Sequence, residues 1–188
     1  MKNFNNIIID TIKILNKGGV ILYPTDTIWG IGCDATNKQA ISKIYSIKNR
    51  GRDNPLILLM NKNMLSQYVE NIPDAAQDII NNSSSPTTII YNTPKNLPTE
   101  LIYKNTIGIR VVKNHYLNHL LAFFDKPITS TSANISGHHS PNSFEDISED
   151  LKNQVDYIVP KTVNNTTTNN ASRIIKVTNN NVMKIIRK

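Results

Sequence analysis

Residues 7–24 read IIIDTIKILNKGGVILYP and contain two different hydrophobic patterns in succession. Over residues 7–15 the apolar side chains recur at helical spacing, which is typical of a helix with one buried face. The glycine pair 18–19 then ends the helix. The unbroken apolar run 20–23 indicates a buried β-strand, and Pro24 ends its backbone pairing. A helix followed at once by a buried strand is the pattern of an α/β domain.

The same two kinds of segment continue along the chain. Further helices are predicted at 38–48, 64–70, 73–82 and 115–124, and further strands at 56–60, 87–91, 106–112, 126–132, 155–159, 173–177 and 182–187. Helices and strands alternate early and strands follow one another late, which predicts an α/β fold with a twisted, open, mixed sheet flanked by helices. No internal repeat or linker divides the chain, so we expect one domain over residues 1–188. The polar run 162–170 is expected to be a surface loop.

Charge and cysteine content limit the classes of protein. The 188 residues carry 21 Lys and Arg against 14 Asp and Glu, a formal net charge of +7. This excess favours anionic partners such as nucleotides or RNA, although charge alone is better explained by a solvated basic surface. Cys33 is the only cysteine, which excludes an internal disulfide. No long apolar run follows the N-terminal residues, so no signal peptide is expected. No apolar run elsewhere approaches the roughly 20 residues that a membrane span needs. We expect a cytoplasmic protein without a membrane partner.

A polar segment, PTDTIWG at residues 24–30, follows the first strand directly. Loops at the ends of strands in α/β folds commonly bind ligands, and two hydroxyls with a carboxylate suit a small polar ligand. The same side chains could instead cap a helix or satisfy backbone groups. Taken alone, this segment favours capping.

A basic segment, KNRGRDNPL at residues 48–56, lies at the end of a predicted helix. Cations are stabilised there by the helix dipole. Lys48, Arg50 and Arg52 could equally form a phosphate site, because ammonium and guanidinium groups match phosphate oxygens. The sequence supports both interpretations equally. It contains neither G-x-x-x-x-G-K-[ST] nor G-x-G-x-x-G, so a P-loop and a dinucleotide fold are not expected.

The predicted strand 106–112 carries a charge among apolar residues. Alternation places Thr106, Gly108 and Arg110 on one face and apolar residues on the other. An arginine on a central strand is unfavourable unless an anion pairs with it. We therefore expect either a protein carboxylate or a ligand carboxylate beside Arg110.

Hydroxyl and amide side chains dominate the segment STSANISG, residues 130–137. If the chain is extended there, Ser130, Ser132 and Asn134 point the same way and need partners when buried. A Ser- and Asn-rich turn is the alternative, and it explains the whole row poorly. The pair His115 and His119 has helical spacing but lacks a second set of ligands, so no metal site is expected in the protein.

These motifs, followed by a late Ser172-Arg173-Ile174, occur in an order that resembles the YrdC/Sua5 family of threonylcarbamoyl-AMP synthases over nearly the whole chain. The resemblance implies a YrdC-like fold in its short, single-domain form, with a large basic concave surface. It also implies a nucleotidyltransferase that converts L-threonine, bicarbonate and ATP into threonylcarbamoyl-AMP and pyrophosphate. The product would serve N6-threonylcarbamoyladenosine (t6A) modification of tRNA at position 37.

The resemblance also implies roles for individual residues. Threonine binding is implied for Thr27, Arg110, Ser130 and Ser172. ATP binding is implied for Lys48, Arg50, Asn54, Thr106, Ser132, Asn134, Ser140 and Arg187. Among these, Lys48 and Arg50 would be catalytic by offsetting phosphate charge, with Mg²⁺ accompanying ATP as the cofactor. The implied further partners are tRNA and a downstream threonylcarbamoyl transferase complex.

The chain departs from the family pattern at three places. Gly51 stands where proline often follows the Lys-x-Arg pair, Leu59 stands where some members have histidine, and 83–85 replace a Trp-Pro-Gly segment. Two other functions stay open at this point. One is a tRNA or double-stranded RNA binding module without catalysis, because a basic concave surface suits an A-form backbone. The other is an enzyme of the same fold that acts on a different carboxylate substrate.

Overall fold

The computed structural model describes residues 3–163 and 170–188. The strands are β1 (Ile21–Tyr23), β2 (Gly30–Gly32), β3 (Ile57–Met60), β4 (Thr87–Asn92), β5 (Thr106–Val111), β6 (Ile128–Ser132), β7 (Tyr157–Ile158), β8 (Arg173–Val177) and β9 (Met183–Arg187). The helices are α1 (Phe4–Asn16), α2 (Lys38–Ile47), α3 (Leu65–Tyr68), α4 (Asp74–Asn82), α5 (His115–Phe124) and α6 (Glu149–Gln154). Short 3₁₀ helices lie at Lys62–Met64, Thr99–Leu101 and Lys161–Val163.

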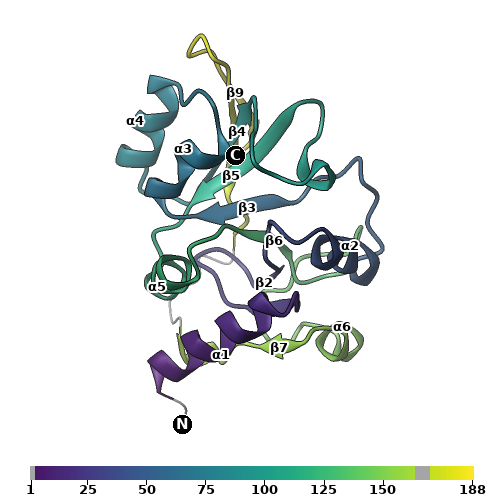
Figure 1. Cartoon of the computed structure of the whole chain (residues 1–188). Coiled ribbons are helices and arrows are strands. Elements are labelled where there is room, and N and C mark those ends of the chain that lie inside the picture. The colour runs from purple at the N-terminus through teal and green to yellow at the C-terminus, as the bar shows by residue number, and fades with distance from the viewer. Residues whose placement is uncertain (1–2, 164–169) are drawn as a thin grey trace.

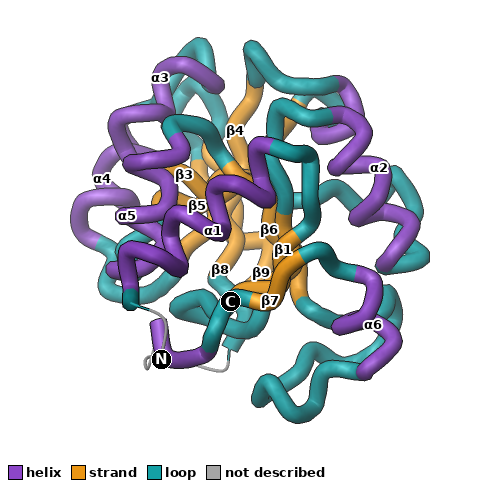
Figure 2. The backbone as a smooth tube through the Cα atoms, turned by 60° about the horizontal axis from the view of Figure 1, so that its bottom comes forward, coloured by secondary structure: helices purple, strands orange, loops and turns teal. Residues whose placement is uncertain are grey.

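All of these strands belong to one sheet with the order β7-β1-β2-β6-β3-β5-β4-β8-β9. The pairs β1–β7, β3–β5 and β4–β8 are parallel, whereas β1–β2, β2–β6, β3–β6, β4–β5 and β8–β9 are antiparallel. Figure 1 shows α3 and α4 together beside β4 and β5. Figure 2 shows the strands in the middle of the molecule, with α1, α3, α4 and α5 on one side of the view and α2 and α6 on the other. The predicted α/β fold with a mixed sheet flanked by helices is confirmed.

Helix positions follow from apolar periodicity and from asparagine caps. The side chains of Asn3, Asn37 and Asn114 accept backbone N–H groups at the starts of α1, α2 and α5, which satisfies donors that a helix leaves free. Helices α1 and α5 also bond to each other, since Thr11 Oγ1 lies 3.0 Å from the hydroxyl of Tyr116. Among the described helices, none has the length and apolar character that crossing a membrane requires.

Two elements were not predicted, β2 and α6. Strand β2 reads Gly-Ile-Gly, a sequence with low strand propensity. Gly32 is required here because an added Cβ would lie 2.1 Å from the carbonyl oxygen of Thr129. Only glycine therefore allows β6 to approach β2 this closely. Helix α6 has only Leu151 buried, so it shows no apolar period. Of the predicted loop 162–170, residues 164–169 lie outside the described part of the chain.

Candidate functional site

A cavity of about 440 Å³ opens on one face of the sheet. Its walls come from the loop after β1, the segment before β3, one face of β4 and β5, the end of β6 and the β8–β9 hairpin. Ten of the twelve predicted site residues line it: Thr27, Arg50, Asn54, Thr106, Arg110, Ser130, Ser132, Ser140, Ser172 and Arg187. Segments more than 150 positions apart along the chain, from Thr27 to Arg187, therefore meet in one hollow.

The predicted alternation along β5 is confirmed and explains why Arg110 is here. Thr106, Gly108 and Arg110 line the cavity, whereas Ile109 and Val111 face a second cavity on the opposite side of the sheet. The smallest residue, Gly108, stands between the two polar ones, where an added Cβ would lie 3.1 Å from a side-chain carbon of Ile57. Strand β5 thus presents an open, polar floor.

Arg110 is 3% exposed and is only partly satisfied by the protein. Its Nη1 donates to Thr27 Oγ1 at 3.1 Å, and its Nη2 lies 3.2 Å from Asp26 Oδ1. Its Nε is buried without a hydrogen-bond partner among the described residues. Asp26 is therefore the protein carboxylate that was expected beside Arg110. The Nε donor of the guanidinium nevertheless has no partner in the described part of the chain. A buried donor without a partner is unfavourable, so the geometry is suited to an incoming carboxylate.

The loop after β1 fixes the hydrogen-bond roles of Thr27. Thr25 donates its hydroxyl to the carbonyl of Ile28 at 2.7 Å, and its oxygen accepts the backbone N–H of Thr27 at 2.9 Å. The hydroxyls of Thr25 and Thr27 are 2.8 Å apart, so Thr27 donates to Thr25 and accepts from Arg110. The capping interpretation fits Thr25, which satisfies backbone groups. Thr27 lines the cavity and keeps a lone pair for a ligand donor.

Hydrogen bonds join β4, the residue before β8, and β9 in the cavity wall that these strands form. Ser172 Oγ lies 2.8 Å from Thr88 Oγ1, and Arg187 donates to the carbonyl of Ser172 from Nε at 3.0 Å and from Nη2 at 2.7 Å. Thr88 lines the cavity but was not among the predicted site residues. The alternation of β4, in which Thr88 and Ile90 share a face, is the signal that could have found it.

Arg50 closes the loop that leads into β3. Its Nε donates to the carbonyl of Asn54 and its Nη2 to the Asn54 side chain, both at 2.7 Å, and Nη2 also reaches the carbonyl of Pro55 at 3.2 Å. Nη1 lies 3.5 Å from the hydroxyl of Thr131. The partners are all neutral, so the positive charge of Arg50 is not cancelled by them.

Among the described residues that line the cavity, the charged ones are all cationic. Arg50, Arg110 and Arg187 line it, and its described lining contains no aspartate or glutamate. Burial lowers the pKa of Arg50, and burial together with the nearby charge of Arg110 lowers the pKa of Arg187. Burial disfavours the charged forms of both arginines, and a bound anion would oppose this effect.

Two predicted residues, Lys48 and Asn134, do not line the cavity. The side chain of Lys48 is fully buried, and its Nζ donates to the carbonyl of Ser132 at 2.5 Å and to the carbonyl of Asn134. Asn134 donates its Nδ2 to the carbonyls of Ile135 and His138 at 3.0 and 2.7 Å. Both residues fasten the segment after β6 from behind, so they shape the wall that carries Ser132.

Burial, with a smaller contribution from the charge of Arg50, lowers the pKa of Lys48 from 10.5 to about 7. Between these pH values the unfolded chain binds one proton more than the native protein, so stability should rise with pH across that window and be flat below it. Relative to a Lys48→Met variant, the wild type should gain about 2 kcal/mol of unfolding free energy from pH 7 to pH 9, within the limit of about 1.4 kcal/mol per pH unit. Urea unfolding of both proteins measures this. An unchanged difference would show that the two carbonyls keep Lys48 charged.

The three departures from the family pattern lie away from the cavity walls. Leu59 is fully buried in β3, and Gly51 is exposed. Residues 83–85 line the second cavity. The histidines His115 and His119 pack with the ring of Phe4, with ring centroids 5.2 and 5.7 Å away.

The fold and the cavity define an α/β protein with an arginine-lined cavity on one face of a mixed sheet. The family model for the Sua5/YciO/YrdC domain, described as "Telomere recombination", matches residues 13–188. The chain belongs to the Sua5/YciO/YrdC family.

Several relatives share most of this chain. A threonylcarbamoyl-AMP synthase from Pseudoalteromonas translucida is 36% identical over 153 residues, which are 79% of this chain and 82% of that protein. A threonylcarbamoyl-AMP synthase from Idiomarina loihiensis is 30% identical over 173 residues, which are 89% of this chain and 92% of that protein.

Solved structures agree with this relationship. YciO from E. coli matches with a TM-score of 0.84 and 27% identity, over 100% of this chain and 91% of that one. Sua5 from P. abyssi complexed with L-threonine also matches with a TM-score of 0.84, at 25% identity. The match covers 94% of this chain and 52% of the Sua5 chain, so this chain spans about half the length of that protein.

Proposed function

We propose that this chain is an L-threonylcarbamoyladenylate synthase, which forms threonylcarbamoyl-AMP and pyrophosphate from L-threonine, bicarbonate and ATP. The observation that carries the proposal is the open Nε donor of buried Arg110, in the same cavity as Arg50 and Arg187. One cavity thus offers a carboxylate receptor and additional cations for phosphates. Relatives named threonylcarbamoyl-AMP synthases and a threonine complex of a related Sua5 support the same reading.

Threonine is proposed to bind at the end of the cavity where β5 meets the loop after β1. Its carboxylate would receive the open Nε of Arg110, since a guanidinium matches the plane of a carboxylate. Its ammonium and hydroxyl would bond to the oxygens of Thr27, Ser130 and Ser172, which all line the cavity and are each at most 6% exposed. Buried hydroxyls of this kind select for a ligand that can hydrogen-bond.

ATP is proposed to occupy the part of the cavity next to Arg50. Ser132 and Ser140 line this side, and Asn54 is held against Arg50 by two hydrogen bonds. Lys48 would act on the phosphates through the segment it fastens. Mg²⁺ would enter on the triphosphate, because the described lining carries no carboxylate and phosphate oxygens with water are its usual ligands.

The chemistry then requires positioning rather than covalent catalysis. The threonine ammonium gives a proton to water, the resulting amine attacks the carbon of bicarbonate and water leaves, which gives a carbamate. A carbamate oxygen attacks the α-phosphorus of ATP, and the bond to the bridging oxygen breaks as pyrophosphate leaves. Arg50 and Arg187 would neutralise charge that develops on the phosphates, an effect that is strong once the bound substrates exclude water. Holding the carbamate beside the α-phosphate would supply the remaining rate enhancement.

The product is a mixed anhydride, so a transferase must consume it before water does. We propose that a downstream threonylcarbamoyl transferase complex passes the group to the adenosine at position 37 of tRNA, and that both act in the cytosol. The net charge of +7 is compatible with direct contact to tRNA.

Pyrophosphate release is the measurement that tests this function. Purified protein with ATP, Mg²⁺ and bicarbonate should release pyrophosphate only when L-threonine is added, and D-threonine should not replace it. L-serine lacks one methyl group and should be used less efficiently, by about 10-fold. Release without any dependence on threonine would contradict the proposal. Salt-sensitive tRNA binding with no turnover would favour an RNA-binding module instead.

A further inference from the structure

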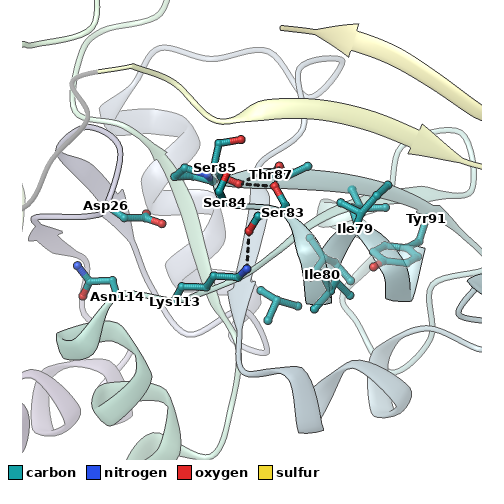
Figure 3. Close-up of a pocket in the computed structure, with 14 residues that line it drawn as sticks. Asp26, Ile79, Ile80, Ser83, Ser84, Ser85, Thr87, Tyr91, Lys113 and Asn114 are labelled. Carbon is teal, nitrogen blue, oxygen red and sulfur yellow. Dashed lines mark hydrogen bonds between the residues drawn. The ribbon is translucent and has the colours of Figure 1, made fainter. Parts of the chain in front are cut away.

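A second cavity, of about 290 Å³, lies on the opposite face of β4 and β5 from the substrate cavity. It is bounded by α4, the serine loop 83–85 that follows α4, and the start of α5. Figure 3 shows Asp26, Lys113 and Asn114 at one end of this cavity and Tyr91 at the other, with Ile79 and Ile80 near Tyr91. Neither the family resemblance nor the proposed reaction uses this cavity.

The polar end of the second cavity carries both signs of charge. The carboxylate of Asp26 is 19% exposed, and its Oδ1 forms an ion pair with Nη2 of Arg110 at 3.2 Å. The Lys113 ammonium donates to the carbonyl of Ser83 at 2.6 Å (Figure 3). The Ser83 carbonyl is a neutral partner, so Lys113 can still receive an anion. A carboxylate and an ammonium group at one end of a cavity are complementary to the two charges of a zwitterion.

The remainder of the second cavity is mostly apolar. Ile79 and Ile80 of α4 face Ile89 of β4 and Ile109 of β5 across it. Helix α4 packs loosely, since Ala76 is its only fully buried residue. Tyr91 is 1% exposed, and its hydroxyl has no hydrogen-bond partner among the described residues. A buried hydroxyl without a partner is unfavourable, and a ligand that accepts a hydrogen bond would satisfy it.

We infer that the second cavity is a binding site for a free α-amino acid with an uncharged, largely apolar side chain. The ammonium of the ligand lies against Asp26, its carboxylate against Lys113, and its side chain between the isoleucines of α4 and of the sheet. A side chain with an acceptor near its end, such as the thioether sulfur of methionine, also reaches the hydroxyl of Tyr91. Arginine, lysine, aspartate and glutamate are excluded because their side-chain charge would be buried among isoleucines.

Asp26 connects this second site to the substrate cavity. Its Oδ1 lies 3.2 Å from Nη2 of Arg110, the residue proposed to hold the carboxylate of threonine. A ligand ammonium beside Asp26 draws that carboxylate away from Arg110 and leaves the guanidinium more positive. Threonine then binds more tightly, by about 5-fold for a typical coupling between two sites. This coupling rests on the proposed function, whereas the binding itself does not.

Direct titration tests the binding without any turnover. L-Methionine, L-leucine, L-isoleucine and L-phenylalanine are added to the full chain while amide chemical shifts are followed by NMR. Saturable shifts at residues of α4 and the serine loop are expected for at least one of them. Lys113→Ala and Ile80→Phe should each weaken that binding by 10-fold or more, roughly the effect of losing one buried contact, while Lys38→Ala, on the exposed end of α2, should not.

The same variants separate the two parts of the inference. The second site is overturned if no saturable binding occurs up to millimolar concentrations. It is also overturned if the binding survives in Lys113→Ala and Ile80→Phe and threonine displaces the ligand. Binding that leaves the KM for threonine unchanged overturns the coupling through Asp26. Absence of threonine-dependent pyrophosphate release in the wild type would instead count against the proposed function, and the NMR titration would still decide the second site.

Discussion

Replacement of Arg110 by leucine is expected to raise the KM for threonine about 100-fold or more, because the variant removes the buried guanidinium that is proposed to pair with the ligand carboxylate. Loss of one partner from a buried charge pair costs about 2–5 kcal/mol, which corresponds to a factor of about 30 to several thousand. The KM for ATP should change much less, because Arg50 and Arg187 remain in the cavity. Initial rates of pyrophosphate release at varied threonine and at varied ATP measure both constants.

The control must remove the carboxylate that Arg110→Leu leaves unpaired. The double variant with Asp26→Asn serves this purpose, because an amide tolerates burial without a cation better than a carboxylate does. If the double variant unfolds at the wild-type urea concentration but still shows the raised KM, the loss belongs to the ligand and not to the fold. Arg110→Lys keeps the charge and loses the planar fork, so an intermediate KM is expected. A normal KM for threonine in Arg110→Leu would contradict the proposed binding mode.

Local periodicity predicted much of the fold because it depends on near neighbours in the sequence. The apolar spacing of residues 7–15 and the apolar run after it correspond to α1 and β1. The alternation in β5 also predicts that Gly108 and Arg110 face the opposite side of the sheet from Ile109, as the two cavities show. Which face a side chain occupies follows from a period of two, so the sequence alone is sufficient for it.

Long-range geometry was not available from the same patterns. The sequence places Lys48 and Arg50 in one basic motif, but it does not show that Lys48 turns inward to carbonyls 84 and 86 positions further along the chain. That outcome depends on how the segment after β6 crosses the end of α2. Strand β2 was missed for a similar reason, since its glycines are explained only by the close approach of Thr129.

The second cavity is the clearest example of a feature that local sequence patterns do not predict. It exists because α4 covers the sheet with little buried surface, and no local pattern encodes such a gap. Its polar end combines Asp26, from the loop after β1, with Lys113, which follows β5. Asp26 was predicted as a cap or as a ligand for the substrate, and the structure places it between the two cavities, in contact with Arg110. Asp26 thus lines the second cavity and pairs with an arginine of the substrate cavity.

Replacement of Arg50 by alanine is expected to abolish pyrophosphate release, with a fall in kcat of about 1,000-fold, while the far-UV circular dichroism spectrum stays unchanged. Removal of one preorganised donor to a developing charge typically costs a factor of about 100 to 1,000. Arg50 also holds Asn54 in place through two bonds of 2.7 Å, so its loss should loosen the loop before β3 as well. Because that loop is largely exposed, loosening it should leave the sheet and its spectrum intact.

Arg52 provides a matched control two positions away. It lies in the same loop, stacks over the ring of Tyr45 at 4.2 Å and bonds to the hydroxyl of Ser42 at 3.1 Å, and it does not line the cavity. Arg52→Ala removes the same charge from the same segment, so general electrostatic attraction of ATP predicts equal losses in the two variants. A specific role for Arg50 predicts near-normal kcat in Arg52→Ala and a large loss in Arg50→Ala. Equal activities would show that the cavity binds ATP through net charge and not through the fork of Arg50.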